Sequence, residues 1–574
     1  MRLIILTWIY SILICTAMAT NIKFGGRSAF YDSGTDTWLC SVAKYMFGHD
    51  WTTTLSTDSA TCWSDIALDG VPMDSNSLVT FTNIQADRQY LLTAVDSTGM
   101  PITLPICFTY LPVLHLQGDF NDDYQVTSIE VALPNAATQS MLARVKHRGA
   151  TTNLPDRHKR NYHIKFINAS DSSKMDRRFF GLRNDNSWIL DAGQIDMLRI
   201  RNRVMTELWL DLCRKPYYAD REPNALLGVR GDMVEVMLND RYAGIYALTE
   251  AMDRKQMKLA KYEEPDSVTS GKFHGMLWKS KIPDIISRMT YFYGYNNSKD
   301  TWGGFEVKYP DPDDYLRTDF STLGNAVKFV ANSTNEEFRQ HVGEYFDIPV
   351  IMDYWILINA VLAIDNGVKN IYWAVYDKQQ DKKLTLAAWD LDCTVGQNWS
   401  NEPLHADNAA PDRNLGYFNN LFLRLHELNP DSFCVKAVER YQLLRKDLLD
   451  ADSIYNRFEK RINYLKQCGA IARETARWSG DSDLSFNQLD FDAELAFIRN
   501  WLDVHLPYLD RTRFSPYIKG DVTRDGVVDI ADVNFLINKM LKASDHPTWY
   551  EDLSPDDIYD IADINQLINI ILHQ

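Results

Sequence analysis

The sequence predicts a multidomain α+β protein. It has an N-terminal β-sandwich, a central α+β domain that ends in a helical region, and a small C-terminal α module. The 574 residues suffice for about three or four domains of ordinary size. Hydrophobic residues make up 45% and charged residues 24%, which is a globular composition. Along the chain, β-type alternation gives way to amphipathic helical runs and then to a short internal repeat.

The chain is strongly acidic, with a formal net charge of -17. Such a charge repels the phosphate backbone of nucleic acids and anionic lipids, so we expect no nucleic acid partner. Clustered carboxylates can instead hold divalent cations, so the positions where acidic residues cluster are candidate metal sites.

The N-terminus has the pattern of a signal peptide over residues 1–19. Arg2 precedes the apolar run Leu3–Cys15, and Ala17-Met-Ala19 is a small-x-small cleavage site. The apolar run is short for a membrane span, and an uncleaved signal anchor is the alternative. We expect cleavage near Ala19 and a mature chain, secreted or at the cell surface, that has no transmembrane span.

Cysteine usage gives no sign of a zinc site, because no CxxC spacing occurs. Of the eight cysteines, Cys15 is lost with the signal peptide, so an odd number remains outside the cytoplasm. A disulfide between Cys40 and Cys62 and a set of buried free thiols are both compatible with the sequence.

Residues 20–116 are expected to form the β-sandwich. Runs of β-branched and aromatic residues at 77–83, 89–94 and 102–110 are separated by turn residues. Three tryptophans are expected to pack in this domain, with a glycan-binding surface as the alternative: Trp38, Trp51 and Trp63.

Residues 117–515 are expected to form one α+β domain, with an N-terminal lobe to about residue 255 and a helical lobe after it. Hydrophobic periodicity assigns the elements. Strands are expected at 128–133, 162–166, 233–238, 244–248, 371–376 and 384–389, and helices at 203–214, 349–364, 431–449 and 491–504.

Residues 519–574 contain an internal repeat. Asp529-Ile-Ala-Asp-Val-Asn534 recurs as Asp560-Ile-Ala-Asp-Ile-Asn565, 31 residues later, and an apolar helical run follows each copy. Each copy also closes a loop with the spacing of an EF-hand. The oxygen side chains are Asp521, Thr523, Asp525, Asp529 and Asp532 in the first loop, and Asp552, Ser554, Asp556, Asp560 and Asp563 in the second.

These loops predict two Ca²⁺ sites, because calcium takes six or more hard oxygen ligands. Gly526 stands at the sixth position of the first loop, where a sharp turn is needed. The second loop has Asp557 there and Pro555 before it, so we expect it to bind more weakly or to differ in shape. Over residues 519–572 the repeat resembles a type I dockerin, which implies a cohesin-like partner. The alternative is a calcium-stabilised acidic tail.

The central domain carries residues in the order that phosphoryl transfer requires. Such catalysis needs a lysine on the phosphates, a carboxylate near the attacking hydroxyl, and metal ligands. The helix expected at 349–364 leads to Asp365, and Asn370 follows five positions later. After two strands come Asp390, 25 positions beyond Asp365, and then Asp392.

Upstream residues complete this pattern. Lys165 lies in the strand that would present a phosphate-binding lysine, and Glu207 in the next helix is a candidate partner for it. Arg148, beside Gly149, is a candidate phosphate contact, and Glu250 ends a strand where a hinge would meet adenine.

At these positions the chain resembles the CotH-type kinases over roughly residues 110–440. The matching motifs are Arg148-Gly149, Lys159-Arg-Asn-Tyr-His-Ile-Lys165, Glu235 to Glu250, Lys308-Tyr-Pro310 and Trp389-Asp-Leu-Asp392. The resemblance implies an atypical kinase fold and ATP-dependent phosphorylation of a protein in the envelope or extracellular space. It also implies Mg²⁺ or Mn²⁺ as cofactor.

Carried over by position, Asp365 is the catalytic base, and Asp390 holds magnesium with Asn370 or Asp392 as a second ligand. Lys165 holds the phosphates and Glu207 orients it. Asn161 and His163 depart from the residues common in the family, where proline and arginine are usual. An inactive member that serves as a surface-binding module, attached through its dockerin-like tail, is therefore the alternative function.

Overall fold

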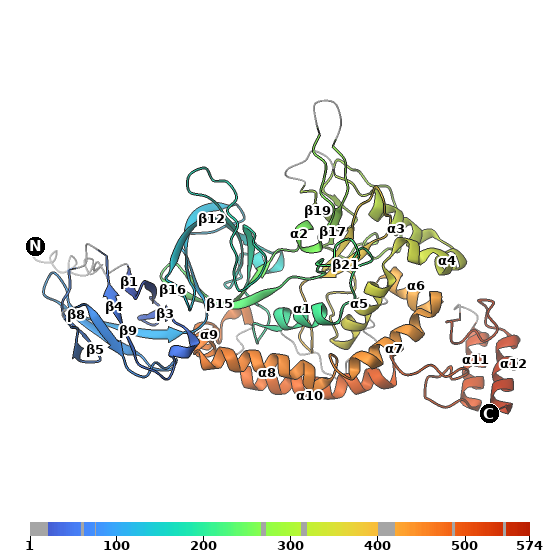
Figure 1. The fold of residues 1–574 in the computed structure, drawn as a ribbon. Helices are drawn as coiled ribbons and strands as arrows, with labels where there is room; N and C mark the ends of the chain where they lie inside the picture. Colours follow the sequence, from blue (N-terminus) through green and yellow to red (C-terminus); the bar gives the residue numbers. More distant parts are fainter. Residues whose placement is uncertain are drawn as a thin grey trace, which may run out of the picture. The chain divides into compact units, whose positions relative to one another are not determined.

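The structure is a computed structural model. It describes residues 21–58, 62–74, 76–265, 271–311, 318–399, 419–484, 488–542 and 547–573, so the predicted signal peptide lies outside the described residues. The chain forms two compact units, whose elements are labelled in Figure 1. The first unit comprises Met1–Gln194, Gly231–Thr249 and Arg461–Leu489, and the second comprises Ile195–Arg230, Glu250–Lys460 and Asp490–Gln574.

The N-terminal domain is one curled, nine-stranded sheet, so the prediction of a two-layered sandwich was wrong. Its order is β6 (Val71–Pro72), β5 (Ser64–Leu68), β8 (Tyr90–Val95), β9 (Pro101–Thr109), β3 (Thr37–Ser41), β2 (Arg27–Asp32), β1 (Ile22–Phe24), β4 (Trp51–Ser56) and β7 (Leu78–Phe81). The cause is the parallel pairing of β3 with β9, from Trp38 opposite Ile106 to Ser41 opposite Thr109. This pairing joins early and late strands in one hydrogen-bonded sheet. Alternation of residues along a strand does not reveal such pairing.

Aromatic side chains fill the concave core of this sheet. Trp38 is 3% exposed, and the ring of Trp51 stacks on Phe81 with 5.7 Å between centroids. Trp63 packs against the same core from its edge. The disulfide between Cys40 and Cys62 does not form, because Cys40 is buried and Cys62 is exposed, and both are free thiols.

The first unit also contains a closed seven-stranded barrel. Its order is β10 (Val113–Leu116), β11 (Gln125–Ala132), β12 (Gln139–Arg148), β13 (Asn161–Phe166), β14 (Ser187–Asp191), β16 (Arg241–Glu250) and β15 (Gly231–Leu238). The parallel pair β10–β15 closes the ring. The core contains Trp188, Tyr162 and Ile164, which are at most 3% exposed. Helix α9 (Ala470–Trp478) also belongs to this unit.

The second unit is built on a five-stranded sheet and a set of helices. The sheet order is β18 (Thr301–Trp302), β19 (Phe305–Tyr309), β17 (Met276–Ser280), β20 (Ile371–Val375) and β21 (Thr385–Ala388). The helices are α1 (Arg201–Leu212), α2 (Arg254–Met257), α3 (Ser321–Asn332), α4 (Asn335–Tyr345), α5 (Ile348–Ala360), α6 (Asn420–Leu428), α7 (Phe433–Arg445) and α10 (Phe491–Arg511).

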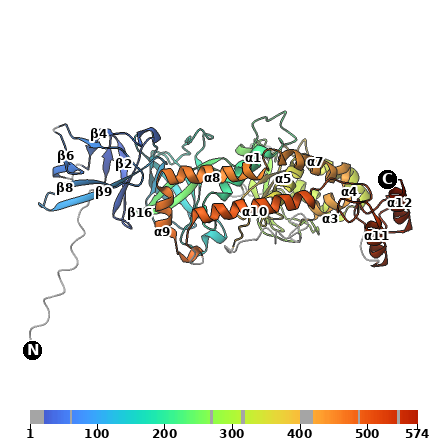
Figure 2. The ribbon, with the colours of Figure 1, turned by 90° about the horizontal axis from the view of Figure 1, so that it is seen from below.

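Helix α8 (Ala451–Gln467) begins in this unit, and its first turns run beside α10 in Figure 2. There Arg499 of α10 forms an ion pair with Asp452 of α8.

Helix α5 is the centre of the second unit. Eleven of its thirteen residues are buried, which suits a helix that is apolar on all sides. Its Asp353 is fully buried and is held by Arg214 and Arg440, at 2.9 and 3.1 Å. The helix ends at Ala360, before the expected residue 364, because Leu362 takes a left-handed conformation with φ of 46°.

The C-terminal module has two helices, α11 (Ile530–Lys542) and α12 (Ile561–Leu572). A small apolar core joins them, with Val522, Val533, Leu536, Ile564 and Leu567 all less than 6% exposed. Among the residues that the structure describes, no helix has both the length and the apolar character needed to cross a membrane.

Candidate functional site

The loop that follows α5 brings Asp365 and Asn370 together. The side-chain amide of Asn370 donates a hydrogen bond to Oδ2 of Asp365 at 3.1 Å. The ammonium group of Lys369 lies 2.6 Å from the same oxygen. Asn370 has φ of 60°, in the left-handed region that asparagine tolerates better than most side chains. The loop therefore turns back on itself and holds the carboxylate from both sides.

A second loop, after β21, is hydrogen-bonded to the first. The amide of the fully buried Asn366 donates to the carbonyl oxygen of Trp389 at 2.8 Å, and the N–H of Trp389 donates to the carbonyl of Asn370 at 3.1 Å. Asp390 follows directly, with φ of 58°. Non-glycine residues in this conformation cost free energy and collect at functional sites. The contacts fix Asp390 beside the loop of Asp365.

Three carboxylates gather around the buried Cys393. Burial raises the pKa of its thiol, and the negative charges of Asp392, Asp365 and Asp390 raise it further. Because the charges of all three carboxylates raise the pKa of one thiol, the carboxylates lie in the same region of the second unit.

Two lysines balance this negative charge. Burial raises the pKa of Asp365 above its usual range, while Lys369, Asn370 and Lys279 act in the opposite direction. Lys279 projects from β17, and its ammonium lies 5.6 Å from the centre of the Trp389 ring. A carboxylate whose pKa is raised by burial binds a proton more readily, which suits a group that accepts a proton.

The donor set of this cluster fits a hard divalent cation. Asp365, Asp390 and Asp392 offer carboxylate oxygens, and Asn370 offers an amide oxygen. Magnesium and manganese prefer such ligands, whereas zinc prefers nitrogen and sulfur. Cys393 is the sulfur atom nearby, but burial and the carboxylates keep it protonated.

Lys165 and Arg148 belong to the first unit. Lys165 lies in β13 opposite Arg144 of β12, and its ammonium is 4.8 Å from the centre of the Tyr124 ring. Arg148 is the last residue of β12, and Gly149 follows with φ of 114°. Their assignment to phosphate binding stays a prediction.

Glu207 and Glu250 have local partners in the second unit. Glu207 lies one helical turn after Arg203 of α1, 3.3 Å from its guanidinium. The Glu250 carboxylate is fully buried, 2.6 Å from Arg230, and accepts a hydrogen bond from Gln256 at 2.9 Å. A nucleotide contact at Glu250 would therefore involve its backbone rather than its side chain.

Several charged residues that sequence reasoning left without a role have structural partners. Lys369 stands in the loop between Asp365 and Asn370, and its position four residues after Asp365 was the available signal. Lys279 gave no signal, because its contact depends on the pairing of β17 with β20. Lys159 and Glu474, which are 315 residues apart in the chain, form a buried ion pair at 3.0 Å. No local sequence pattern predicts such a pair.

The first C-terminal loop folds around its own carboxylates. Oδ1 of Asp532 accepts hydrogen bonds from the N–H and the hydroxyl of Thr523, at 2.9 and 3.0 Å. The carboxylate of Asp521 accepts from the N–H groups of Asp525 and Gly526, at 3.1 and 2.9 Å. Asp521 and Asp532 are at most 3% exposed. Oxygen atoms of three side chains thus converge inside the loop.

The second loop repeats this hydrogen-bond pattern, but its backbone differs as expected at Pro555, since the equivalent Arg524 of the first loop has a φ of 62° that proline cannot adopt. Asp563 accepts from the N–H and hydroxyl of Ser554, both at 2.9 Å, and Asp552 accepts from the N–H groups of Asp556 and Asp557. Asp557 replaces glycine at the sixth position with φ of 62°. Burial raises the pKa of Asp552, and the charges of Asp563 and Asp556 add to the effect.

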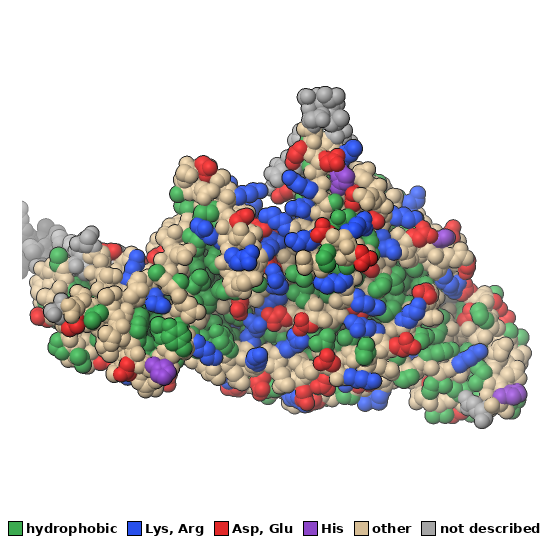
Figure 3. Space-filling view, in the orientation of Figure 1, with side chains coloured by type: hydrophobic (Ala, Val, Ile, Leu, Met, Phe, Trp, Pro, Cys, Tyr) green, Lys and Arg blue, Asp and Glu red, His purple; other side chains and the backbone are tan. Residues whose placement is uncertain are grey.

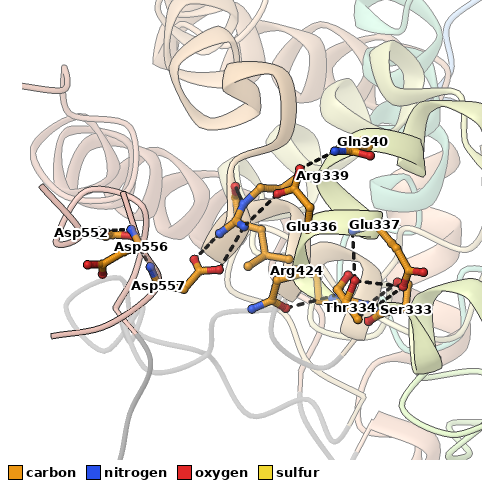
Figure 4. Close-up of polar contacts among 12 residues, drawn as sticks. Ser333, Thr334, Glu336, Glu337, Arg339, Gln340, Arg424, Asp552, Asp556 and Asp557 are labelled. Carbon is orange, nitrogen blue, oxygen red and sulfur yellow. Dashed lines mark hydrogen bonds and ion pairs between the residues drawn. The ribbon is translucent and has the colours of Figure 1, made fainter. Parts of the chain in front are cut away.

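The side chain of Asp557 points out of the loop toward helix α4. Its carboxylate forms a two-armed ion pair with Arg339, with one N–O distance of 3.1 Å (Figure 4). Asp557 is therefore bound outside the loop, and the candidate ligands of the second loop remain Asp552, Ser554, Asp556, Asp560 and Asp563.

Comparison of the sequence with known protein families gives one match. The family described as CotH kinase protein matches residues 145–509, which is more than half of the chain. The chain therefore belongs to the CotH kinase family. The match includes both loops of the carboxylate cluster and extends through most of α10. No curated protein matches the chain.

Proposed function

We propose that this protein is an atypical kinase that transfers the γ-phosphate of ATP to a serine, threonine or tyrosine hydroxyl of another protein. The supporting observation is the hydrogen bond between Asn370 and Asp365 beside Asp390 and Asp392, inside the region of the family match. Phosphoryl transfer depends mainly on positioning and charge stabilisation, which such a cluster can supply.

Each residue of the cluster has a distinct role in this proposal. Asp365 accepts the proton of the attacking hydroxyl, and Lys369 favours its ionised state. Asp390 holds Mg²⁺ or Mn²⁺ with Asn370 or Asp392, and the cation supplies positive charge to the phosphates. Lys165 and Arg148 contact the phosphates, and Glu207 orients Lys165.

We further propose that the protein acts outside the cytoplasm, on a substrate in the envelope or extracellular space. The signal-peptide pattern over residues 1–19 supports this location. Acidic and basic side chains are intermixed on the face drawn in Figure 3. Together with a net charge of -17, this favours a protein partner over nucleic acid.

The C-terminal module is proposed to bind two Ca²⁺ ions and to attach the protein to a larger assembly. The matching hydrogen-bond patterns of the two loops support calcium binding, because each gathers carboxylate oxygens that repel one another without a cation. The dockerin-like sequence pattern supports a cohesin-like partner.

The kinase proposal is tested by incubating the full chain with labelled ATP and Mg²⁺ or Mn²⁺, and by following its melting temperature with the same ligands. We expect phosphate incorporation and an increase in melting temperature, because a ligand of the native state stabilises by mass action. Asp390→Asn is expected to abolish both effects.

Asp381→Asn is the matched control, because Asp381 forms a partly exposed ion pair with Arg221 in the same unit. It should leave both effects intact. A wild-type chain that neither incorporates phosphate nor is stabilised by ATP and metal would refute the kinase proposal. The non-catalytic surface module would then be the better account.

A further inference from the structure

The first unit contains a cavity of about 820 Å³ that belongs to no site described above. Three parts of the unit line it: the N-terminal sheet and its loops, the β15–β16 hairpin, and the corner between α8 and α9. Its apolar lining includes Leu39, Phe47, Ile84, Met237 and Tyr242. The volume lies in the range of ordinary ligand pockets.

A smaller cavity of about 400 Å³ adjoins it and shares Arg241, Tyr242 and Arg477 with the first. It also touches the aromatic side chains of Tyr162, Tyr246 and Trp478. The two arginines therefore lie where the cavities meet.

The guanidinium groups of these arginines have unused hydrogen-bond donors. Arg241 is exposed, and its guanidinium group makes no hydrogen bond to any other residue that the structure describes. Arg477 uses only its Nε, which donates to the carbonyl of Tyr242 at 3.1 Å, and its guanidinium lies over the Trp478 ring at 3.9 Å. Burial lowers the pKa of Arg477, and the positive charge of Arg241 lowers it further.

Three of the nearby carboxylates already have other partners, while Asp240 also lines the smaller cavity. Asp32 accepts hydrogen bonds from Thr35 and from the N–H of Tyr242, at 2.7 and 3.0 Å. Glu235 is paired with Arg473 at 2.7 Å, and Glu474 with Lys159 at 3.0 Å. Two cationic groups thus lie close together in an acidic protein, and the carboxylates of Asp32, Glu235 and Glu474 are bonded elsewhere.

We propose that Arg241 and Arg477 form an anion-binding site for a ligand that carries a carboxylate or phosphate on an apolar body. The planar guanidinium groups match the geometry of either oxyanion, and binding would relieve their mutual repulsion. The apolar body would occupy the larger cavity, against Phe47, Ile84 and Met237.

This site is distinct from the carboxylate cluster and independent of the proposed kinase activity. The loops of the N-terminal sheet, which supply Phe47 and Ile84, lie outside the family match that begins at residue 145. The pocket is thus lined both by residues inside the family match and by residues that precede it.

The test is isothermal titration calorimetry of the full chain with phenyl phosphate, with phenylacetate, and with phenol as an uncharged comparison. We expect saturable binding of at least one anion and none of phenol. The double variant Arg241→Gln/Arg477→Gln should weaken binding by about tenfold or more. Comparing the two anions distinguishes a phosphate from a carboxylate ligand.

Arg88→Gln is the matched control, because Arg88 lines the same cavity but is already paired with Asp69 at 2.8 Å. It should bind the anion as the wild type does. Arg241→Gln alone changes an exposed side chain, so it provides a folded variant if the double variant misfolds. Absence of anion binding, or equal binding by the arginine variants, would overturn the proposal.

Discussion

Asn370 donates a 3.1 Å hydrogen bond from its side-chain amide to the carboxylate of Asp365, five residues earlier in the chain. This bond closes the loop after α5, and the backbone of Asn370 ties the same loop to Trp389. One asparagine therefore positions a carboxylate and joins the two loops that carry the acidic cluster. Because the backbone of Asn370 is left-handed, substitutions there can change the conformational strain and the side-chain hydrogen bond independently.

Replacement of Asn370 by glycine or alanine should distinguish these two roles. Asn370→Gly removes the amide but relieves the left-handed strain, whereas Asn370→Ala removes the amide and adds about 1–2 kcal/mol of strain. We expect both variants to lose stabilisation by ATP and metal, with Asn370→Ala melting at the lower temperature. Equal melting temperatures, or retained nucleotide effects, would contradict this account. Differential scanning fluorimetry provides the measurement.

Lys369→Met should move the acidic limb of the pH–activity profile to higher pH. Burial raises the pKa of Asp365, and Lys369 is the strongest of the groups that oppose this rise. Without the ammonium, the carboxylate should stay protonated to higher pH, and a protonated Asp365 is no base. Lys382→Met, which breaks an exposed pair with Glu344, should leave the profile unchanged. An unshifted acidic limb for Lys369→Met would argue against Asp365 as the base.

Sequence reasoning predicted a contact between residues close in the chain and failed where contacts depend on strand pairing. The five-residue spacing of Asp365 and Asn370 is local, so the pattern points to residues that are in contact. The single curled sheet depends on β3 meeting β9, and Lys279 meets the cluster only through the β17–β20 pairing. The tertiary fold determines which strands pair, and the periodicity of residues along one strand does not predict this pairing.

The buried ion pair of Lys159 and Glu474 also joins residues far apart in the chain, and it leads to a prediction about stability. Both side chains are at most 1% exposed, and Lys159 also donates to the carbonyls of Ala192 and Ile245. Lys159→Met leaves a buried carboxylate without its counter-charge, which should cost about 3–5 kcal/mol.

The double variant Lys159→Met/Glu474→Gln should cost less than Lys159→Met alone, because it leaves no lone buried charge. Arg88→Met, which breaks a partly exposed pair, should cost less than about 1 kcal/mol. Urea unfolding measures all three variants. A double variant at least as unstable as Lys159→Met would show that the unpaired charge of Glu474 is not the main cause of the lost stability.

The buried His505 should make the stability of the second unit sensitive to acid. The side chain is 1% exposed, and burial lowers its pKa from 6.5 to about 4. Below pH 6.5 the unfolded chain gains a proton that the folded chain does not accept until about pH 4. The free energy of unfolding should therefore fall over this window by up to about 3 kcal/mol. His505→Gln should lose less stability on acidification in denaturant titrations at pH 7 and pH 5. Identical acid dependence would exclude His505 as the cause.

Calcium should stabilise the C-terminal module through the two loops. Each loop gathers carboxylate oxygens that repel one another, and burial raises the pKa of Asp552 together with the charges of Asp563 and Asp556. Calcium at about one hundred times its Kd would add about 2.7 kcal/mol of stability. Asp532→Asn and Asp563→Asn should each remove one binding event in calorimetric titration, and acidification should weaken the second loop as Asp552 becomes protonated.

Asp557 provides the internal control for the calcium prediction. Its carboxylate is paired with Arg339 outside the loop, and its φ of 62° is a conformation that glycine adopts freely. Asp557→Gly should therefore preserve calcium binding while it breaks the contact with α4, and Arg339→Gln should have the same effect. If Asp557→Gly removes one calcium ion while Asp563→Asn does not, the carboxylate that binds the ion is Asp557 and the assignment of the second loop is wrong.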